Sequence, residues 1–141
     1  MSTVVLVSGG FDPLHSGHIH YLQAAKDLGD LLIVGINSDA WLARKKGQAF
    51  LPAAERRIIM ANLRMVDQVI EVADDDNTAC QAIRDVLQLY PHDCIVFANG
   101  GDRTAVNIPE MTVPGVTFAF GVGGNDKINS SSWILKSWQA A

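Results

Sequence analysis

The chain has 141 residues, a formal net charge of −4 and 48% hydrophobic residues, which suffices for a single domain with a hydrophobic core but not for two. The acidic balance argues against a general nucleic-acid or membrane-surface binder, although a small anionic ligand remains possible. Without a run of about 18 apolar residues, and with two cysteines (Cys80 and Cys94) that form no CxxC motif, we expect a cytoplasmic protein with free thiols.

Strand and helix patterns alternate along the chain. Five short apolar runs predict strands at Val4–Val7, Leu31–Ile36, Gln68–Val72, Cys94–Ala98 and Val116–Phe120. Apolar residues at helical spacing predict helices at His18–Leu28, Ala53–Met65, Asn77–Leu89 and Ser130–Gln139. This alternation predicts a single α/β domain, a Rossmann-like, doubly wound, five-stranded parallel sheet with helices on both faces.

Two segments of the chain stand apart from this alternation. The segment Arg44–Pro52 follows neither the strand nor the helix periodicity and contains consecutive cations, so we expect a mobile basic loop there. The run from Gly9 to His18 lies where the first strand passes into the first helix, which is where open α/β sheets bind phosphates.

Two histidines in that run, His15 and His18, are three residues apart, and Gly17 between them permits close approach of a ligand to the backbone. Two imidazoles beside a helix N-terminus suit a polyphosphate, because both stabilise negative charge. A metal pair and a purely structural role are the alternatives. A metal would need further ligands, and His20, His92 and the acidic residues show no ligand-like spacing.

The run GFDPLHSGH resembles the signature of the cytidylyltransferase-like nucleotidyltransferases. Four further segments resemble that family in the same order: Val34–Asp39, Ala54–Arg57, Met65–Val69 and Asn99–Arg103. The segments are most similar to those of glycerol-3-phosphate cytidylyltransferases and of the adenylyltransferase domain of bifunctional heptose-phosphate enzymes. The resemblance implies transfer of CMP or AMP from CTP or ATP to a small phosphorylated acceptor, a glycerol phosphate or sugar phosphate, with release of pyrophosphate.

The resemblance also assigns roles to residues. It implies catalytic roles for His15, His18 and Lys46, with Lys45 as a rival for the lysine. The nucleotide-binding residues that it implies are Gly9, Gly10, Phe11, His15, His18, Gly101, Asp102, Arg103, Asn129, Ser130, Ser131 and Ser132. The acceptor-binding residues that it implies are Asp12, Asp39, Arg57 and Asp67, whereas we expect Arg56 at the surface.

Structural roles remain open for several of these residues. The lysine pair can be a solvated charge run, and the Gly100–Arg103 segment a plain turn. Ser38-Asp39 can cap a helix, and Asp67 can be structural. A cap at Ser130 is compatible with phosphate binding.

Two departures from the family affect the choice of substrate. Gly10 stands where many members have Thr, and Asn125-Asp126 replaces an Arg-Thr pair, which leaves Lys127 as a substitute cation. Thr104–Pro114 is expected to shape the acceptor pocket.

The resemblance further implies Mg²⁺ held through the nucleotide phosphates, with no direct protein ligand. It also implies a homodimer, for which Trp41 and the Met60–Met65 segment are candidate contacts. The alternative functions are a catalytically silent nucleotide-binding regulator and a structural subunit.

Overall fold

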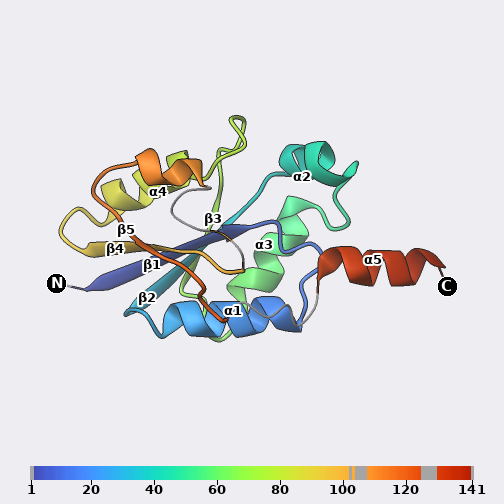
Figure 1. Cartoon of the computed structure of the whole chain (residues 1–141), viewed down its shortest axis with the longest axis horizontal. Helices are drawn as coiled ribbons and strands as arrows, with labels where there is room; N and C mark the ends of the chain where they lie inside the picture. Colours follow the sequence, from blue (N-terminus) through green and yellow to red (C-terminus); the bar gives the residue numbers. More distant parts are fainter. Residues whose placement is uncertain (1, 102, 104–107, 125–129, 141) are drawn as a thin grey trace.

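The sheet expected from the sequence is present. The computed structural model describes residues 2–101, 103, 108–124 and 130–140. Five parallel strands, β1 (Thr3–Gly9), β2 (Leu31–Ile36), β3 (Gln68–Glu71), β4 (Cys94–Ala98) and β5 (Thr117–Ala119), pair in the order β3-β2-β1-β4-β5. The parallel pairing places all five carboxyl ends at one edge of the sheet (Figure 1).

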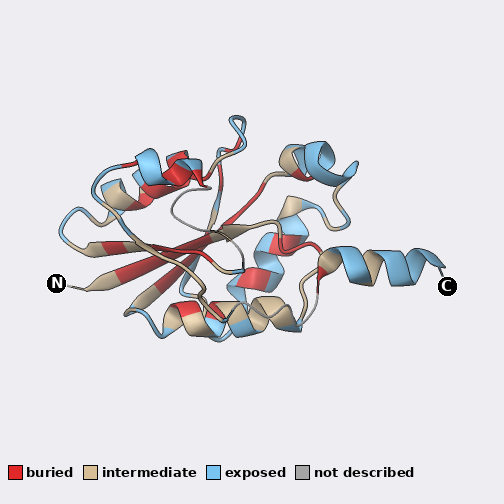
Figure 2. Ribbon diagram, in the orientation of Figure 1, coloured by how far each residue is buried: buried red, intermediate tan, exposed pale blue. Residues whose placement is uncertain are grey.

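The helices cover both faces of the sheet. They are α1 (Ser16–Lys26), α2 (Asp39–Lys46), α3 (Ala53–Ala61), α4 (Cys80–Leu89) and α5 (Ser131–Ala140), with a 3₁₀ helix, η1 (Pro109–Thr112), before β5. The core has two parts because successive strand residues point to opposite faces. Val5 and Val7 pack with α1 and α3, whereas Leu6 and Phe97 pack with α4 and η1. Figure 2 shows the buried centre of the sheet between these layers.

Helix α2 was not expected from the sequence. The Ser38 hydroxyl accepts a hydrogen bond from the Trp41 amide at 3.0 Å, and Gly47 ends the helix with φ 95°, a left-handed value that favours glycine. The predicted basic loop is therefore wrong over Arg44–Lys46, which form the last turn of α2. Only the segment from 47 to 52 remains a connection.

The other boundaries differ from the expected ones by a few residues at helix ends. Helix α3 ends at Ala61 rather than Met65, and α4 begins at Cys80 rather than Asn77. None of the helices in the described ranges is both long and apolar enough to cross a membrane. Both cysteines are free thiols, as expected.

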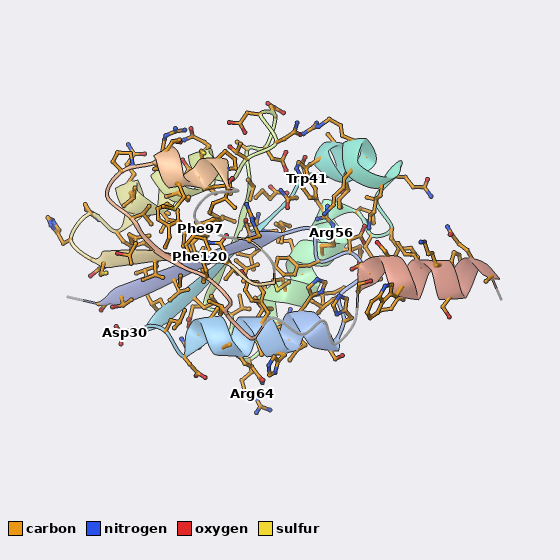
Figure 3. All side chains as sticks on the ribbon, viewed as in Figure 1. Asp30, Trp41, Arg56, Arg64, Phe97 and Phe120 are labelled. Carbon is orange, nitrogen blue, oxygen red and sulfur yellow. The ribbon has the colours of Figure 1, made fainter. Side chains whose placement is uncertain are left out.

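One arginine joins the ends of the strands. Arg56 of α3 is 2% exposed, which corrects its expected surface position. Its guanidinium donates to the carbonyls of Gly10 at 3.0 Å, Asn37 at 2.7 Å and Leu51 at 2.9 Å. It also pairs with the Asp39 carboxylate at 2.7 Å. The segments after β1 and β2 and the connection before α3 are thus held together by one side chain, labelled in Figure 3.

We predict that Arg56→Met lowers the free energy of unfolding by about 2–4 kcal/mol, because three buried carbonyls lose their donor. Arg57→Met is the matched control. Arg57 is half exposed, and its pair with Glu71 is long, at 3.6 Å, so we expect a loss of about 0.5 kcal/mol or less. Urea unfolding of both variants at pH 7.5 measures the difference. Equal losses would contradict the role given to Arg56.

Candidate active site

The two histidines begin α1 and hold each other in place. The His15 Nδ1 accepts a hydrogen bond from the Gly17 amide at 3.0 Å, and the His15 amide donates to the His18 Nδ1 at 3.3 Å. This is a reciprocal capping box with imidazoles in place of the usual Ser and Glu side chains. Because each Nδ1 is an acceptor, each neutral ring carries its proton on Nε2. The capping hydrogen bonds therefore fix the tautomer of both neutral rings, in which Nε2–H is the donor.

His18 is held in its neutral form. Its pKa is lowered to about 3, first by burial and then by the neighbouring His15. The two rings stack with centroids 3.8 Å apart, and Phe11 meets His18 edge-on at 5.0 Å. At neutral pH His18 offers an uncharged N–H donor at the positive end of a helix.

Asp12 organises the connection between α2 and α3. Its buried carboxylate accepts hydrogen bonds from the amides of Phe50 at 2.6 Å and Leu51 at 2.7 Å. The Lys46 ammonium lies 3.2 Å from the same carboxylate and also donates to the Asp12 carbonyl. These contacts order the connection between α2 and α3 around Asp12. Both carboxylate oxygens are engaged within the protein, so a direct substrate contact from Asp12 has little support.

The two lysines of the basic segment have different surroundings. Lys46 is bound to Asp12, whereas the Lys45 ammonium lies 4.8 Å from the centroid of the Trp41 ring. Burial, then Lys46 and Arg103, lower the pKa of Lys45. Among the described residues no carboxylate pairs with Lys45. Lys45 therefore carries a positive charge that an anion can neutralise.

Gly10 allows α2 to approach the end of β1. A Cβ atom at Gly10 would lie 2.9 Å from the Leu42 Cδ2 and 3.7 Å from the Trp41 ring. A threonine at this position, common in the family that the sequence resembles, would force Leu42 to move. The glycine at position 10, where many family members have threonine, thus allows the close packing of the helix that carries Trp41 and Lys45.

The Gly100 turn packs on Tyr21, a residue that sequence reasoning did not single out. The Tyr21 hydroxyl donates to the Ala98 carbonyl at 2.6 Å, and burial raises its pKa. A Cβ atom at Gly100 would lie 3.1 Å from the Tyr21 ring, and one at Gly123 would lie 3.1 Å from the Tyr21 Cα. Both glycines let the turns after β4 and β5 lie against α1.

Arg103 is fixed by a buried carboxylate. It pairs with Glu110 at 2.7 Å, and Glu110 also accepts the Ala79 amide at 3.0 Å, just before α4. Glu110, in the segment expected to shape the acceptor pocket, is thus engaged within the protein by Arg103 and the Ala79 amide. Asp102 and residues 104–107 of the expected acceptor segment lie outside the described residues.

Asn99 carries a buried polar atom without a partner. The residue is 2% exposed, and its Nδ2 donates to the carbonyls of Phe97 and Ala119, both at 3.3 Å. Its Oδ1 has no hydrogen-bond partner in the described part of the chain. An unpaired buried amide oxygen costs about 1–3 kcal/mol. Nothing in the sequence marked this atom, since its isolation depends on the packing around it.

The start of α5 contacts the histidine loop. Ser130 caps the helix by accepting the Trp133 amide at 3.0 Å, and the Ser131 hydroxyl donates to the Pro13 carbonyl at 2.8 Å. Ser132 is exposed beside them. Beyond this start, α5 buries none of its residues and extends from the body (Figures 1 and 2). Asn129 and the 125–127 segment lie outside the described residues.

Two predicted site residues lie away from the histidines or are engaged elsewhere. Asp67 precedes β3, at the amino edge of the sheet, where it pairs with Lys26 at 2.6 Å and accepts the Leu32 amide at 2.8 Å. Its expected acceptor contact is therefore corrected to the structural role. Arg57 is directed to Glu71, so the buried arginine near the site is Arg56.

Asp39 lies at the first position of α2 and is engaged by Arg56, with Ser38 as the helix cap. The described residues contain no group of three or more His, Cys, Asp or Glu side chains that could hold a metal ion.

Comparison with known proteins identifies the same family that the sequence motifs resemble. Residues 6–121 match the family described as cytidylyltransferase-like. A bifunctional protein HldE from Pelobacter propionicus is 40% identical over 103 residues, which cover 72% of this chain and 20% of that protein. The chain spans only about a fifth to a quarter of the length of such curated relatives.

Two solved structures share the fold. A lipopolysaccharide core biosynthesis protein from Thermoplasma volcanium has a TM-score of 0.68 at 24% identity, covering 89% of this chain and 100% of that one. A bifunctional NMN adenylyltransferase/ADP ribose pyrophosphatase from Francisella tularensis, complexed with AMP and a manganese ion, has a TM-score of 0.65 at 14% identity, covering 100% of this chain and 43% of that one.

The lowered pKa of His18 predicts a pH-dependent stability. Between the usual histidine value near 6.5 and about 3, the unfolded chain takes up a proton that the folded chain refuses, so stability falls as the pH falls. We expect a loss of about 2 kcal/mol from this group between pH 7.5 and pH 5.0. In His18→Gln, a glutamine keeps the capping box and removes the titration.

Urea unfolding of the wild type and His18→Gln at both pH values measures the effect. The variant is expected to lose about 2 kcal/mol less than the wild type on acidification. An identical loss in both proteins would show that His18 titrates normally.

Proposed function

The chain belongs to the cytidylyltransferase-like family of nucleotidyltransferases, and from this premise we propose that it transfers AMP or CMP from ATP or CTP to a small phosphorylated acceptor. The observation that carries the proposal is the capping box of His15 and His18, which presents two Nε2–H donors at the start of α1. The matched relatives favour ATP as the donor, because the Francisella protein holds AMP in its complex.

The proposed reaction is an in-line displacement. A phosphate oxygen of the acceptor attacks the α-phosphorus of the nucleotide, and the bond from that phosphorus to the bridging oxygen of the pyrophosphate breaks. Pyrophosphate leaves with the bonding electrons, and no proton transfer is needed. The protein contributes alignment and electrostatic stabilisation.

The two histidines and the start of α1 would bind the α-phosphate and the departing oxygen. Their N–H groups point to an anion whose charge grows in the transition state, which is the arrangement that lowers a barrier. The backbone of Gly9, Gly10 and Phe11 enters this junction directly from β1. Because these donors are neutral, they would bind the phosphate oxygens by hydrogen bonds alone, and no ion pair would have to break when the products leave.

The start of α5 would hold the β- and γ-phosphates. Ser130, Ser131 and Ser132 stand at a helix N-terminus, where amides and the helix dipole favour anions. The contact of Ser131 with Pro13 keeps this end beside the histidine loop. Mg²⁺ bound to the triphosphate would neutralise charge on the leaving group, and the chain needs to supply no ligand of its own.

The remaining residues receive proposed roles from their surroundings. Arg103 would bind nucleotide or acceptor phosphate from its fixed position against Glu110, with Gly101, Asp102 and Asn129 completing the nucleotide contacts. Asp12 and Asp39 would act by positioning the segments that surround the substrates.

The expected homodimer also remains a proposal. Of its candidate contacts, Met60 is buried in the core, so Ile58 and Ile59 of α3, both exposed, are better placed.

We expect pyrophosphate release from a matrix of the four nucleoside triphosphates and a panel of phosphomonoesters, with the highest turnover for ATP. His18→Ala should retain the fold, by circular dichroism, and lose about 10²–10³-fold in turnover, the effect of one electrostatic donor. Near-normal turnover of this variant would overturn the proposed site. Tight nucleotide binding without pyrophosphate release across the matrix would identify a regulator instead.

We further predict that Lys45, rather than Lys46, supplies the mobile cation at the α-phosphate. Lys45→Met should lower kcat about 10²-fold without a change in unfolding free energy, because its ammonium has no carboxylate partner among the described residues. Lys46→Met should destabilise the fold by about 1–3 kcal/mol, because it leaves the Asp12 carboxylate with fewer partners. Steady-state kinetics and urea unfolding on both variants test the division. The reverse pattern would return the catalytic role to Lys46.

A further inference from the structure

We propose that the Asn99 side-chain oxygen binds a hydroxyl group of the acceptor, so that the enzyme selects a phosphorylated polyol or sugar over a phosphomonoester that lacks that hydroxyl. This inference rests on the proposed function and adds to it the class of acceptor and the residue that recognises it.

The orientation of the Asn99 amide is fixed by its neighbours. Its Nδ2 lies 3.3 Å from two carbonyl oxygens, those of Phe97 and Ala119. Exchange of the amide atoms would set an oxygen against both carbonyls, so the unpaired atom is the oxygen. An unpaired buried acceptor requires a ligand group that donates, such as a hydroxyl, and excludes a phosphate oxygen or a carbonyl.

The position of Asn99 assigns this donor to the acceptor rather than to the triphosphate. Along β4, Phe97 belongs to the core on the α4 side and Ala98 to the core on the α1 side. The alternation of strand residues therefore sends the Asn99 side chain to the α4 side. The histidines begin α1, which covers the other face, as Figures 1 and 3 show.

The in-line geometry requires that the attacking group approach from the side opposite the pyrophosphate. The start of α5, where the pyrophosphate would lie, contacts the histidine loop through Ser131. We therefore place the acceptor on the α4 side. There, Arg103 follows Asn99 by four residues and is held by Glu110 of η1, which also accepts the amide of Ala79 just before α4. A phosphate bound by Arg103 and a hydroxyl bound by Asn99 would orient one small acceptor.

The experiment compares acceptors that differ by one hydroxyl. Glycerol 3-phosphate is paired with the monophosphates of 1,2-propanediol and 1,3-propanediol, and an aldohexose 1-phosphate with its monodeoxy analogues. We expect the wild type to prefer one hydroxylated acceptor over one analogue by about 10- to 100-fold in kcat/KM. In Asn99→Ala that ratio should fall to within about threefold of unity, with the KM for the nucleotide unchanged.

A fold measurement and a control variant separate recognition from folding. We expect Asn99→Ala to keep the circular dichroism spectrum of the wild type, so that a changed ratio reports recognition. Asn62→Ala removes an exposed asparagine whose Nδ2 bonds the Ile58 carbonyl within α3, and it should leave every ratio unchanged. A purely structural role for Asn99 would lower kcat/KM equally for both members of each pair, and that result would overturn the inference.

Binding distinguishes this inference from the proposed function. Isothermal titration of the same acceptor pairs into protein saturated with an α,β-methylene nucleotide requires no turnover. One outcome is binding that depends on the hydroxyl and is abolished in Asn99→Ala, with no pyrophosphate release in the turnover assay. That outcome would support the acceptor site and overturn the proposed transferase activity. Pyrophosphate release without hydroxyl discrimination, in turnover and in binding, would support the transferase and overturn the role of Asn99. The absence of binding by every acceptor would also overturn it.

Discussion

The arrangement of the site depends on a buried guanidinium. In a parallel sheet the segments that follow the strands meet at one edge but have no backbone pairing with one another. Arg56 supplies the missing connection, because its planar group donates to carbonyls after β1, after β2 and before α3. A lysine could not satisfy three carbonyls and a carboxylate in this geometry. The segments that carry Gly10, Asp39 and the lysines are therefore fixed relative to each other by one side chain.

Near Arg56, the starts of helices α1 and α5 carry the groups to which we assign the chemistry. The contacts that cap α1 also choose the tautomer of both imidazoles, so the fold and the proposed catalytic donors depend on the same hydrogen bonds. Burial keeps His18 neutral, at the cost of stability in acid. Ser131 then ties the start of α5 to the same loop, which brings a second helix N-terminus beside the first. Two positive helix ends at one place suit a polyphosphate, in keeping with the family to which the chain belongs.

In the proposed reaction, the two substrates would lie on opposite faces of the sheet. The nucleotide would lie toward α1 and α5, whereas the acceptor would enter from the side of α4, where Asn99 and Arg103 are found. Tyr21 and the glycines that pack on it keep the turns after β4 and β5 close to α1. Both lysines lie in the last turn of α2, where Lys46 pairs with Asp12 and Lys45 lies over the Trp41 ring. In this proposal the loops would select the substrate, and the strand-to-helix junction would carry the reaction.

The five strands, their parallel pairing and the histidine junction followed from the sequence, because apolar runs and glycines act locally. Helix α2 was missed because it is short, carries three consecutive cations and has almost no amphipathic pattern, with Leu42 as its buried residue. The Ser38 cap and tertiary packing define it instead. The sequence could not distinguish Arg56 from Arg57, or Lys45 from Lys46, since neighbours on a helix differ only in the direction in which they point. The fold decided which arginine is buried, which lysine Asp12 neutralises and where Asp67 lies. It also left the Oδ1 of Asn99 without a partner among the described residues. The sequence by itself determined the five strands, the other four α-helices and the histidine pair at the first junction, because these depend on local patterns. The surroundings of each charged side chain were decided by partners far apart in the chain, which only packing brings together.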